Sequence, residues 1–270
     1  MKLNGKVAIV TASGRGIGRG IVLCLAEEGA DVVVNAFHEE TTNKVVSEVK
    51  AMGRQSQGIP GYITKPEMIT KVIQDTLNAF SKIDILVNNV GGIGKTLLAR
   101  TSLDFVDQKD AEWDENYELN LKTQVLMCRA VAPYFIKQKS GKIVNIASIA
   151  GKVNRSQHMA YSAAKAGAIH FTRILASALA EHNINVNCIC PGVIYTPLWE
   201  VFGAQFTQLL PEAKGMTPRE YFDNFLVPRV PLKRGQTVED IGHAVVFLVS
   251  EDAKNITGQS LNVDGGMIMN

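Results

Sequence analysis

Cysteine is scarce in this sequence. Only four of the 270 residues are cysteines, and Cys24, Cys128, Cys188 and Cys190 all lie in apolar surroundings. Cys188 and Cys190 stand two apart in a predicted strand and therefore point to the same face, as small core residues. A zinc site would need more ligands at closer spacing, so no metal is expected. A reduced, cytoplasmic protein fits this cysteine content best.

The chain also lacks an excess of charge and any long apolar run. It contains 28 Lys and Arg residues and 26 Asp and Glu residues, which gives a formal net charge of +2. No basic stripe is present, so neither nucleic acid nor an anionic membrane is an expected partner. No apolar stretch reaches the ~20 residues of a membrane helix. No charged leader and long apolar region precede the first strand, so no signal peptide is expected.

Short β-branched runs alternate with longer amphipathic segments throughout the chain. Several runs, such as Val32-Val33-Val34, are continuously apolar, which is typical of parallel strands buried on both faces. The alternation predicts a doubly wound α/β fold with a mostly parallel sheet of about seven strands. The expected strands span residues 6–11, 31–35, 55–59, 83–88, 142–147, 184–190 and 260–263. The expected helices span residues 16–28, 41–52, 66–80, 111–137, 160–181 and 238–250.

No low-complexity linker divides the sequence, so residues 1–270 are expected to form a single domain. The irregular region is 196–234, where five prolines interrupt aromatic-rich helical pieces. A long connection of this kind in a compact domain is usually functional. We therefore interpret residues 196–234 as a substrate lid.

A glycine-rich segment, Thr11-Ala12-Ser13-Gly14-Arg15-Gly16-Ile17-Gly18, follows the first predicted strand directly. Glycines there allow a tight turn and let the backbone approach a pyrophosphate, which the N-terminus of the next helix attracts. A turn that merely requires positive φ is the alternative reading. The position between the first strand and the first helix favours dinucleotide binding.

Tyr161 and Lys165 are four residues apart and would lie on one face of a helix. A nearby cation favours the phenolate, so we expect Lys165 to lower the pKa of Tyr161 toward the range of a general acid or base. Such a pair is by itself more often a solvated helix pair. Ser148, however, ends a buried strand shortly before, where strand ends line the ligand crevice of open α/β sheets, and its hydroxyl could donate to a substrate oxygen.

These motifs resemble those of the short-chain dehydrogenase/reductase family, whose TGxxxGxG turn has Ala12 here in place of its first glycine. The resemblance implies a Rossmann-type fold and a catalytic tetrad of Ser148, Tyr161, Lys165 and Asn120. Asn120 would hold a water linking Lys165 to solvent; the alternative is a helix-interior Asn that bonds locally. Asn88-Asn89-Val90-Gly91 resembles the family's NNAG.

The resemblance also implies the residues that contact a nicotinamide dinucleotide. They come from the glycine turn, the ends of the second, third and fourth strands, the tetrad, and a Pro-Gly stretch whose Thr contacts the nicotinamide carboxamide. These residues are Ala12, Ser13, Gly14, Arg15, Gly16, Ile17, Gly18, Ala36, Phe37, His38, Tyr62, Ile63, Asn89, Val90, Gly91, Tyr161, Lys165, Pro191, Gly192, Val193, Ile194 and Thr196.

The choice between NADP and NAD depends on the end of the second strand. An acid there would bind the ribose hydroxyl and repel a 2′-phosphate, but Ala36, Phe37 and His38 stand at that position. Arg15 occupies a turn position where many NADP-using members carry a basic residue, although it could be a solvated charge. Tyr62-Ile63 replaces the family's Asp-Val, and Tyr62 could stack on adenine. We expect NADP, with NAD as the alternative.

The expected substrate contacts are Asn154 and His158, between Ser148 and Tyr161, and Trp199 and Phe202 of the lid. So much aromatic surface favours a substrate with an apolar body, such as a cyclic, aromatic or acyl compound. Arg155 or Lys95 could recognise a carboxylate or the phosphates of a thioester, but a surface charge is the preferred reading of both.

The leading functional hypothesis is an NAD(P)-dependent oxidoreductase acting on a ketone or secondary alcohol, with a 3-oxoacyl thioester reductase as the first named activity. A polyol or sugar dehydrogenase and a non-catalytic NADP-binding module are the alternatives. As family members usually are, the chain is expected to be a homotetramer. The helical segments 111–137 and 160–181 carry surplus apolar residues for pairing, namely Leu126, Val131, Phe135, Phe171 and Leu175.

Overall fold

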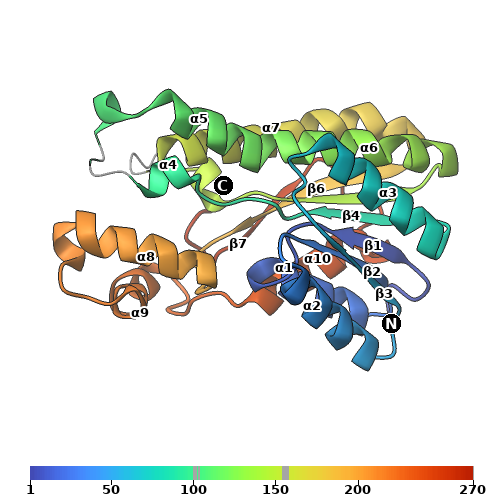
Figure 1. The fold of residues 1–270 in the computed structure, drawn as a ribbon, viewed down its shortest axis with the longest axis horizontal. Helices are drawn as coiled ribbons and strands as arrows, with labels where there is room; N and C mark the ends of the chain where they lie inside the picture. Colours follow the sequence, from blue (N-terminus) through green and yellow to red (C-terminus); the bar gives the residue numbers. More distant parts are fainter. Residues whose placement is uncertain (100–101, 103, 154–157, 270) are drawn as a thin grey trace.

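A seven-stranded parallel sheet forms the centre of the protein in the computed structural model, which describes residues 1–99, 102, 104–153 and 158–269 (Figure 1). The strand order is β3-β2-β1-β4-β5-β6-β7, and every neighbouring pair is parallel. The strands are β1 (Val7–Val10), β2 (Asp31–Ala36), β3 (Ser56–Pro60), β4 (Ile85–Asn88), β5 (Gly141–Ile146), β6 (Ile184–Pro191) and β7 (Ser260–Val263). The predicted doubly wound Rossmann-type fold is confirmed.

Helices cover both faces of this sheet, because its central strands are apolar on both sides. Ala8 and Val10 of β1 pack into one hydrophobic layer, while Ile9 between them packs into the other. The first layer is closed by α1 (Gly16–Glu27), α2 (Glu39–Ala51) and α10 (Val238–Val249). The second is closed by α3 (Pro66–Phe80), α6 (Thr123–Gln138) and α7 (Met159–Leu179) (Figure 1).

The strand order reverses between β1 and β4, and this reversal positions the site. The chain builds outward from β1 to β3 and then returns to place β4 on the other side of β1. The connections after β1 and β4 therefore diverge, and in open α/β sheets ligands bind in the crevice outside the carboxyl ends of the strands at such a reversal. The short helices α4 (Lys95–Leu98), α8 (Pro197–Leu209) and α9 (Pro218–Tyr221) lie at this end of the molecule (Figure 1).

The helical segment predicted over residues 111–137 is present, but it is not α-helical throughout. The segment begins as α5 (Asp110–Tyr117), widens to a π turn over Glu118–Lys122, and continues as α6. A π turn contains one more residue than an α turn, so it changes which side chains face the crevice, and such turns recur at functional sites.

The apolar side chains that were expected to be available for subunit pairing on these helices are largely used within the chain itself. Val131 and Phe135 are fully buried in the layer against the sheet, so they cannot serve an intersubunit contact. Leu126, Phe171 and Leu175 are partly buried against the same layer. The exposed large apolar side chains of α5, α6 and α7 are instead Trp113, Tyr117, Tyr134, Ile136 and Ile174.

The 196–234 region folds into α8, α9 and several short turns of other helix types around its own small core. Tyr221 and Phe222 are buried in that core, so these aromatic side chains stabilise the region itself. All four cysteines are buried with free thiols, and Cys188 and Cys190 share one face of β6, as predicted, with their Sγ atoms 4.0 Å apart. In the part of the chain that the structure describes, no helix combines the length and apolarity needed to cross a bilayer.

Candidate active site

The glycine turn between β1 and α1 has two residues in the left-handed region. Gly16 has φ +55°, and Ala12, where the family has glycine, has φ +50°. A side chain at positive φ costs on the order of 1 kcal/mol, so the turn must be held from outside. Asn89 holds it, because its Nδ2 donates to the carbonyls of Thr11 and Ala12 at 3.2 and 3.0 Å. The predicted residues Asn89 and Ala12 are therefore in direct contact.

Two glycines of the turn have no room for a side chain. A Cβ at Gly18 would lie 2.7 Å from Ser13 Cα, and one at Gly14 would lie 2.8 Å from Ala36 Cβ, so neither position accepts a larger residue. In the described structure no side chain caps α1, and its first turn contains no acidic residue, which leaves its N–H groups available to an anion. Thr196 faces the turn, since a Cβ at Gly16 would lie 3.8 Å from its side chain.

The residues after β2 and β3 form an aromatic group at the outer end of this crevice. The rings of Phe37 and Tyr62 have centroids 4.0 Å apart, and those of Phe37 and His38 4.4 Å apart. Phe37 and Tyr62 are each about half exposed, at 49% and 48%, so their rings present an open apolar surface. Ile63, by contrast, is buried in the core and cannot reach a ligand through its side chain.

Arg15 is exposed at the residue that precedes α1, so its guanidinium can reach toward a ribose phosphate. α2 begins directly after His38, with Glu39 and Glu40 in its first turn. The segment after β2 therefore carries two carboxylates close in sequence to the predicted cofactor residues Ala36, Phe37 and His38.

The tetrad residues meet at the carboxyl ends of β4 and β5. Ser148 follows β5 and accepts a hydrogen bond from the backbone N–H of Ala150 at 3.1 Å. Tyr161 and Lys165 lie one turn apart on α7, with Lys165 Nζ 5.7 Å from the centre of the Tyr161 ring. The Tyr161 phenol lies near enough to Ser148 for this side chain to lower its pKa.

Lys165 is almost completely buried, with 3% of its surface exposed. Its Nζ donates to the carbonyl of Ile146 at 3.0 Å. Burial lowers the pKa of this ammonium to about 8, and the nearby thiols of Cys190 and Cys188 oppose the shift. A lysine with such a pKa can release or take up a proton near neutral pH.

The predicted lowering of the Tyr161 pKa by Lys165 is wrong for the protein without a ligand. Burial raises the pKa of Tyr161 above its ordinary value, and the Ser148 side chain only partly opposes this shift. The physical reason is that surrounding protein atoms displace water from the partly buried phenol, while the Lys165 ammonium donates to the carbonyl of Ile146. Tyr161 is therefore in its protonated form at neutral pH, ready to act as an acid.

Asn120 lies in the π turn and is fully buried. Its Oδ1 accepts from the N–H of Gly92 at 2.9 Å, while its Nδ2 donates to the carbonyls of Gly92 at 2.8 Å and Asn116 at 3.1 Å. The local bond to Asn116 is the alternative that the sequence left open. The two bonds to Gly92 go further, because they fix the segment after β4 to the π turn.

The aromatic side chains of α8 lie beside the phenol of Tyr161. Trp199, Phe202 and Phe206 share one face of α8, and the Phe202 ring lies 6.4 Å from that of Tyr161 at an interplanar angle of 71°. His158 contacts both phenylalanines, with centroid distances of 5.5 Å to Phe202 and 5.2 Å to Phe206. Of the predicted substrate residues, the structure thus brings His158, Trp199 and Phe202 together, while Asn154 lies outside the described residues, as does Arg155.

The other predicted contacts frame the crevice. Pro191 ends β6, and Gln236 holds the residues that follow it. Gln236 Oε1 accepts a hydrogen bond from the N–H of Val193 at 2.9 Å, and the backbone of Gln236 forms a parallel β-bridge with Ile194. Gly192 packs against Asp264, to whose Cβ its own Cβ would lie 2.7 Å. Val90 packs against the α3/α6 side of the core. Lys95 is exposed on α4, in agreement with a surface charge.

The sequence alone did not predict a series of hydrogen bonds between buried polar side chains that lies near the tetrad. Asn88 Nδ2 donates to Asn145 Oδ1 at 2.8 Å, and Asn145 Nδ2 donates to the Thr172 hydroxyl at 2.9 Å, which ties β4 and β5 to α7. An Asn in the middle of the apolar strand 141–146 was the available signal. From the sequence, Phe206 is assigned no contact with substrate. Its spacing of four residues from Phe202 on α8 indicates that it lies on the same helix face as Phe202, beside the predicted substrate contacts.

Known proteins resemble this chain over nearly its whole length. The family model described as enoyl-(acyl carrier protein) reductase matches residues 11–268. The 3-oxoacyl-(acyl-carrier-protein) reductase of Thermotoga maritima is 32% identical, covering 100% of this chain and 100% of that protein. The corresponding reductase of Synechocystis is 37% identical, covering 99% and 98%.

Solved structures agree with these relatives. A 7α-hydroxysteroid dehydrogenase complexed with NADH and 7-oxoglycochenodeoxycholic acid matches with a TM-score of 0.85 and 32% identity, covering 100% of this chain and 96% of that one. L-Sorbose reductase from Gluconobacter frateurii, complexed with NADPH and L-sorbose, matches with a TM-score of 0.89 and 28% identity, covering 100% of both chains.

Proposed function

The chain belongs to the short-chain dehydrogenase/reductase family and is an NAD(P)-dependent oxidoreductase of ketones and secondary alcohols, and on this premise we propose that it reduces a ketone carried on an apolar body, with Tyr161 as the proton donor. The observation that carries the proposal is the contact of the protonated Tyr161 with Ser148 on one side and with the aromatic face of the lid on the other. A carbonyl held there would meet two hydroxyl donors.

In this mechanism Ser148 and Tyr161 both donate to the substrate oxygen, and Tyr161 transfers its proton as the alcohol forms. A reduced nicotinamide bound along the glycine turn would supply the hydride that the carbonyl carbon accepts. Ser148 orients the oxygen and stabilises the negative charge that develops on it. Carbonyl, hydride and proton together give the secondary alcohol, so the reaction balances.

Lys165 replaces the proton that Tyr161 gives up. Its pKa of about 8 lets it pass a proton toward the phenolate at the pH of the cell. Asn120 and Gly91 form the outer wall beside this ammonium, where a water could connect it with solvent. We assign Asn120 the role of holding that wall, because its bonds to Gly92 fix the backbone there.

The substrate class that we propose first is a 3-oxoacyl thioester. The curated relatives named above are 3-oxoacyl-(acyl-carrier-protein) reductases, and their matches cover almost the whole chain. A cyclic ketone is the second candidate. One observation favours it, namely the stacked rings of Trp199 and Phe202, which lie at 22° to each other with centroids 6.1 Å apart and would suit a flat, rigid body.

For the cofactor we propose a preference for NADP(H), since Ala36 offers no carboxylate to repel a 2′-phosphate and Arg15 is exposed beside the turn. We further propose residues 1–270 as one catalytic domain with 196–234 as its lid. The free thiols of all four cysteines support a reducing compartment, the cytoplasm. A homotetramer that buries Trp113, Tyr117 and Ile174 is the proposed assembly, and a monomeric mass by light scattering would contradict it.

The decisive test is a panel of 3-oxoacyl thioesters, cyclic ketones and ketose sugars assayed with NADPH and NADH, following the loss of the reduced nicotinamide. We expect the highest kcat/KM with a 3-oxoacyl thioester and NADPH. A Phe202→Ala variant should raise KM for the substrates with apolar bodies much more than for a ketose sugar. Highest activity with the sugars, unchanged by Phe202→Ala, would overturn the proposed substrate class.

A further inference from the structure

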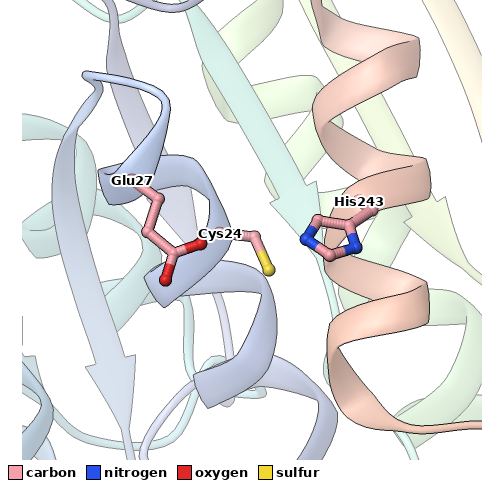
Figure 2. A group of neighbouring side chains, drawn as sticks. All are labelled: Cys24, Glu27 and His243. Atoms are coloured by element: carbon pink, nitrogen blue, oxygen red, sulfur yellow. The ribbon is translucent and has the colours of Figure 1, made fainter. Parts of the chain in front are cut away.

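Three side chains with metal-binding atoms converge on the far side of the molecule from the tetrad. Cys24 and Glu27 are three residues apart on α1, and His243 lies on α10 (Figure 2). Their Sγ, carboxylate oxygen and ring nitrogen all lie within 4.8 Å of one another. We propose that these residues form a binding site for Zn²⁺ or a similar divalent transition metal, which would link α1 to α10.

Close helix packing brings the three side chains together. A Cβ at Gly20 would lie 2.7 Å from Val238 Cβ, and one at Gly242 would collide with Cys24 Sγ, so α1 and α10 touch through glycines. The sulfur of Cys24 therefore rests against the residue that precedes His243. Figure 2 shows the Cys24 thiol and the His243 imidazole facing each other across the gap between the helices, with the Glu27 carboxylate beside Cys24 on α1.

The donor atoms are available for a ligand. Within the described ranges of the chain, neither the Glu27 carboxylate nor the His243 ring has a hydrogen-bond or ion-pair partner. Cys24 Sγ makes only a long contact of 4.0 Å with the carbonyl of Glu239. Glu27 and His243 are exposed, whereas Cys24 is buried, so the site would open to solvent on one side.

The local electrostatics favour a cation. The Glu27 carboxylate lies within 4.8 Å of the Cys24 sulfur, so its negative charge favours a cation between them. Glu27 is also the last residue of α1, whose carboxyl-terminal end carries a partial negative charge. A divalent ion would displace the thiol proton to solvent, and its two positive charges would balance the Cys24 thiolate and the Glu27 carboxylate.

The chemistry of the donors selects the metal. Sulfur, nitrogen and oxygen together suit Zn²⁺, whereas Mg²⁺ and Ca²⁺ prefer sites made of oxygen alone. With bonds of about 2.0–2.3 Å, tetrahedral donors stand roughly 3.3–3.8 Å apart. The observed spread of up to 4.8 Å thus requires a contraction that rotation of the exposed Glu27 and His243 side chains can supply. A water would complete the coordination.

The role of such a site would be structural. It joins the carboxyl-terminal end of α1, the helix whose other end begins at Gly16 beside the glycine turn, to α10. An ion that binds only the folded chain raises stability in proportion to the logarithm of its concentration over Kd. We therefore expect metal to raise Tm and to leave the chemistry at Tyr161 unchanged.

The test uses tag-free, metal-stripped protein titrated with Zn²⁺ for affinity and with Cd²⁺ for the thiolate-to-metal absorption band. Wild type should bind one equivalent, show the band, gain Tm with Zn²⁺, and bind more tightly as pH rises because a proton is released. His243→Gln, an exposed change, and Cys24→Ser should each weaken binding at least tenfold. The control His170→Gln removes an exposed histidine of α7 and should behave as wild type.

Two results would overturn the site. One is a wild-type titration without the thiolate band or a change in Tm. The other is unchanged Zn²⁺ affinity in both Cys24→Ser and His243→Gln. Neither result bears on the ketone reductase proposal, because the assay of that activity does not involve α10. If Cys24→Ser folds poorly, His243→Gln alone decides, since its side chain lies at the surface.

Discussion

Lys165 and Asn120 converge on one backbone position, since a Cβ at Gly91 would lie 2.7 Å from Lys165 Nζ and 2.9 Å from Asn120 Oδ1. The glycine is therefore required by the space between two buried polar groups. A methyl group added there would push the ammonium away from the Ile146 carbonyl or break the bonds of Asn120 to Gly92. Gly91 thus belongs to the site as the position that keeps its outer wall open.

We predict that Gly91→Ala lowers kcat at least tenfold while the chain still folds. The added methyl displaces the group that returns protons to Tyr161, so proton transfer suffers most. Steady-state kinetics together with a thermal melt check this expectation. A Gly91→Ala enzyme with normal turnover would show that this wall has no role.

Tyr161→Phe should reduce turnover by ~10²-fold or more, the scale expected when a positioned proton donor is lost. Cofactor affinity should hardly change, because the phenol hydroxyl faces Ser148 and the lid. Binding of NADPH is measured by fluorescence titration and turnover by the loss of the reduced nicotinamide. Wild-type turnover in Tyr161→Phe would remove Tyr161 from the mechanism.

Lys165 makes stability depend on pH in a direction that can be worked out. Its folded pKa of about 8 lies below the ordinary value of 10.5, so the folded chain releases this proton first. The unfolded chain binds more protons between pH 8 and 10.5, and the contribution of Lys165 to the free energy of unfolding therefore rises with pH across that window. The full change is on the order of 3 kcal/mol.

Other buried groups oppose this trend, because burial raises the pKa of Cys24 and Cys128 to about 11 and about 12. The measurement is therefore a difference in urea unfolding between wild type and Lys165→Met at several pH values. The stability of wild type relative to the variant should increase from pH 8 to pH 10. A constant difference would mean that Lys165 has an ordinary pKa.

The fold could be predicted almost completely from the sequence, and the reason is local. Most of the strands contain a short apolar run, such as Val32-Val33-Val34 of β2, and the long helices carry an apolar face, so the spacing of apolar residues predicts both. The π turn at Asn120 could not be predicted this way. Asn120 in this turn is hydrogen-bonded to Gly92, which is distant in the sequence. The local sequence pattern therefore does not predict the turn.

The candidate site was predictable as a set of residues but not in its electrostatics. Tyr161 and Lys165 follow from helical spacing, whereas the direction of the Tyr161 pKa depends on burial by α8, which belongs to a region far along the sequence. The same limit applies to the group of Cys24, Glu27 and His243. Cysteine spacing gives no indication of it, because His243 comes from a helix near the other end of the chain.

Cofactor preference gives the last prediction, in which Arg15 supplies part of the recognition of the 2′-phosphate. The guanidinium can bind phosphate oxygens through two parallel hydrogen bonds. Losing one charge-assisted contact costs about 1.5–3 kcal/mol, so Arg15→Ala should weaken NADPH binding roughly ten- to a hundredfold. NADH lacks the phosphate, and its affinity should barely change.

A matched control lies one turn further along α1, where the guanidinium of Arg19 is paired with Glu48 at 2.8 Å. Arg19→Ala removes the same charge from the same helix but not from the crevice, so both cofactors should bind it as they bind wild type. Glu39 and Glu40 at the start of α2 act in the opposite direction, because their charges repel a phosphate there. Equal weakening of NADPH and NADH by Arg15→Ala, or a wild type that prefers NADH, would show that Arg15 is a surface charge with no part in recognising the 2′-phosphate.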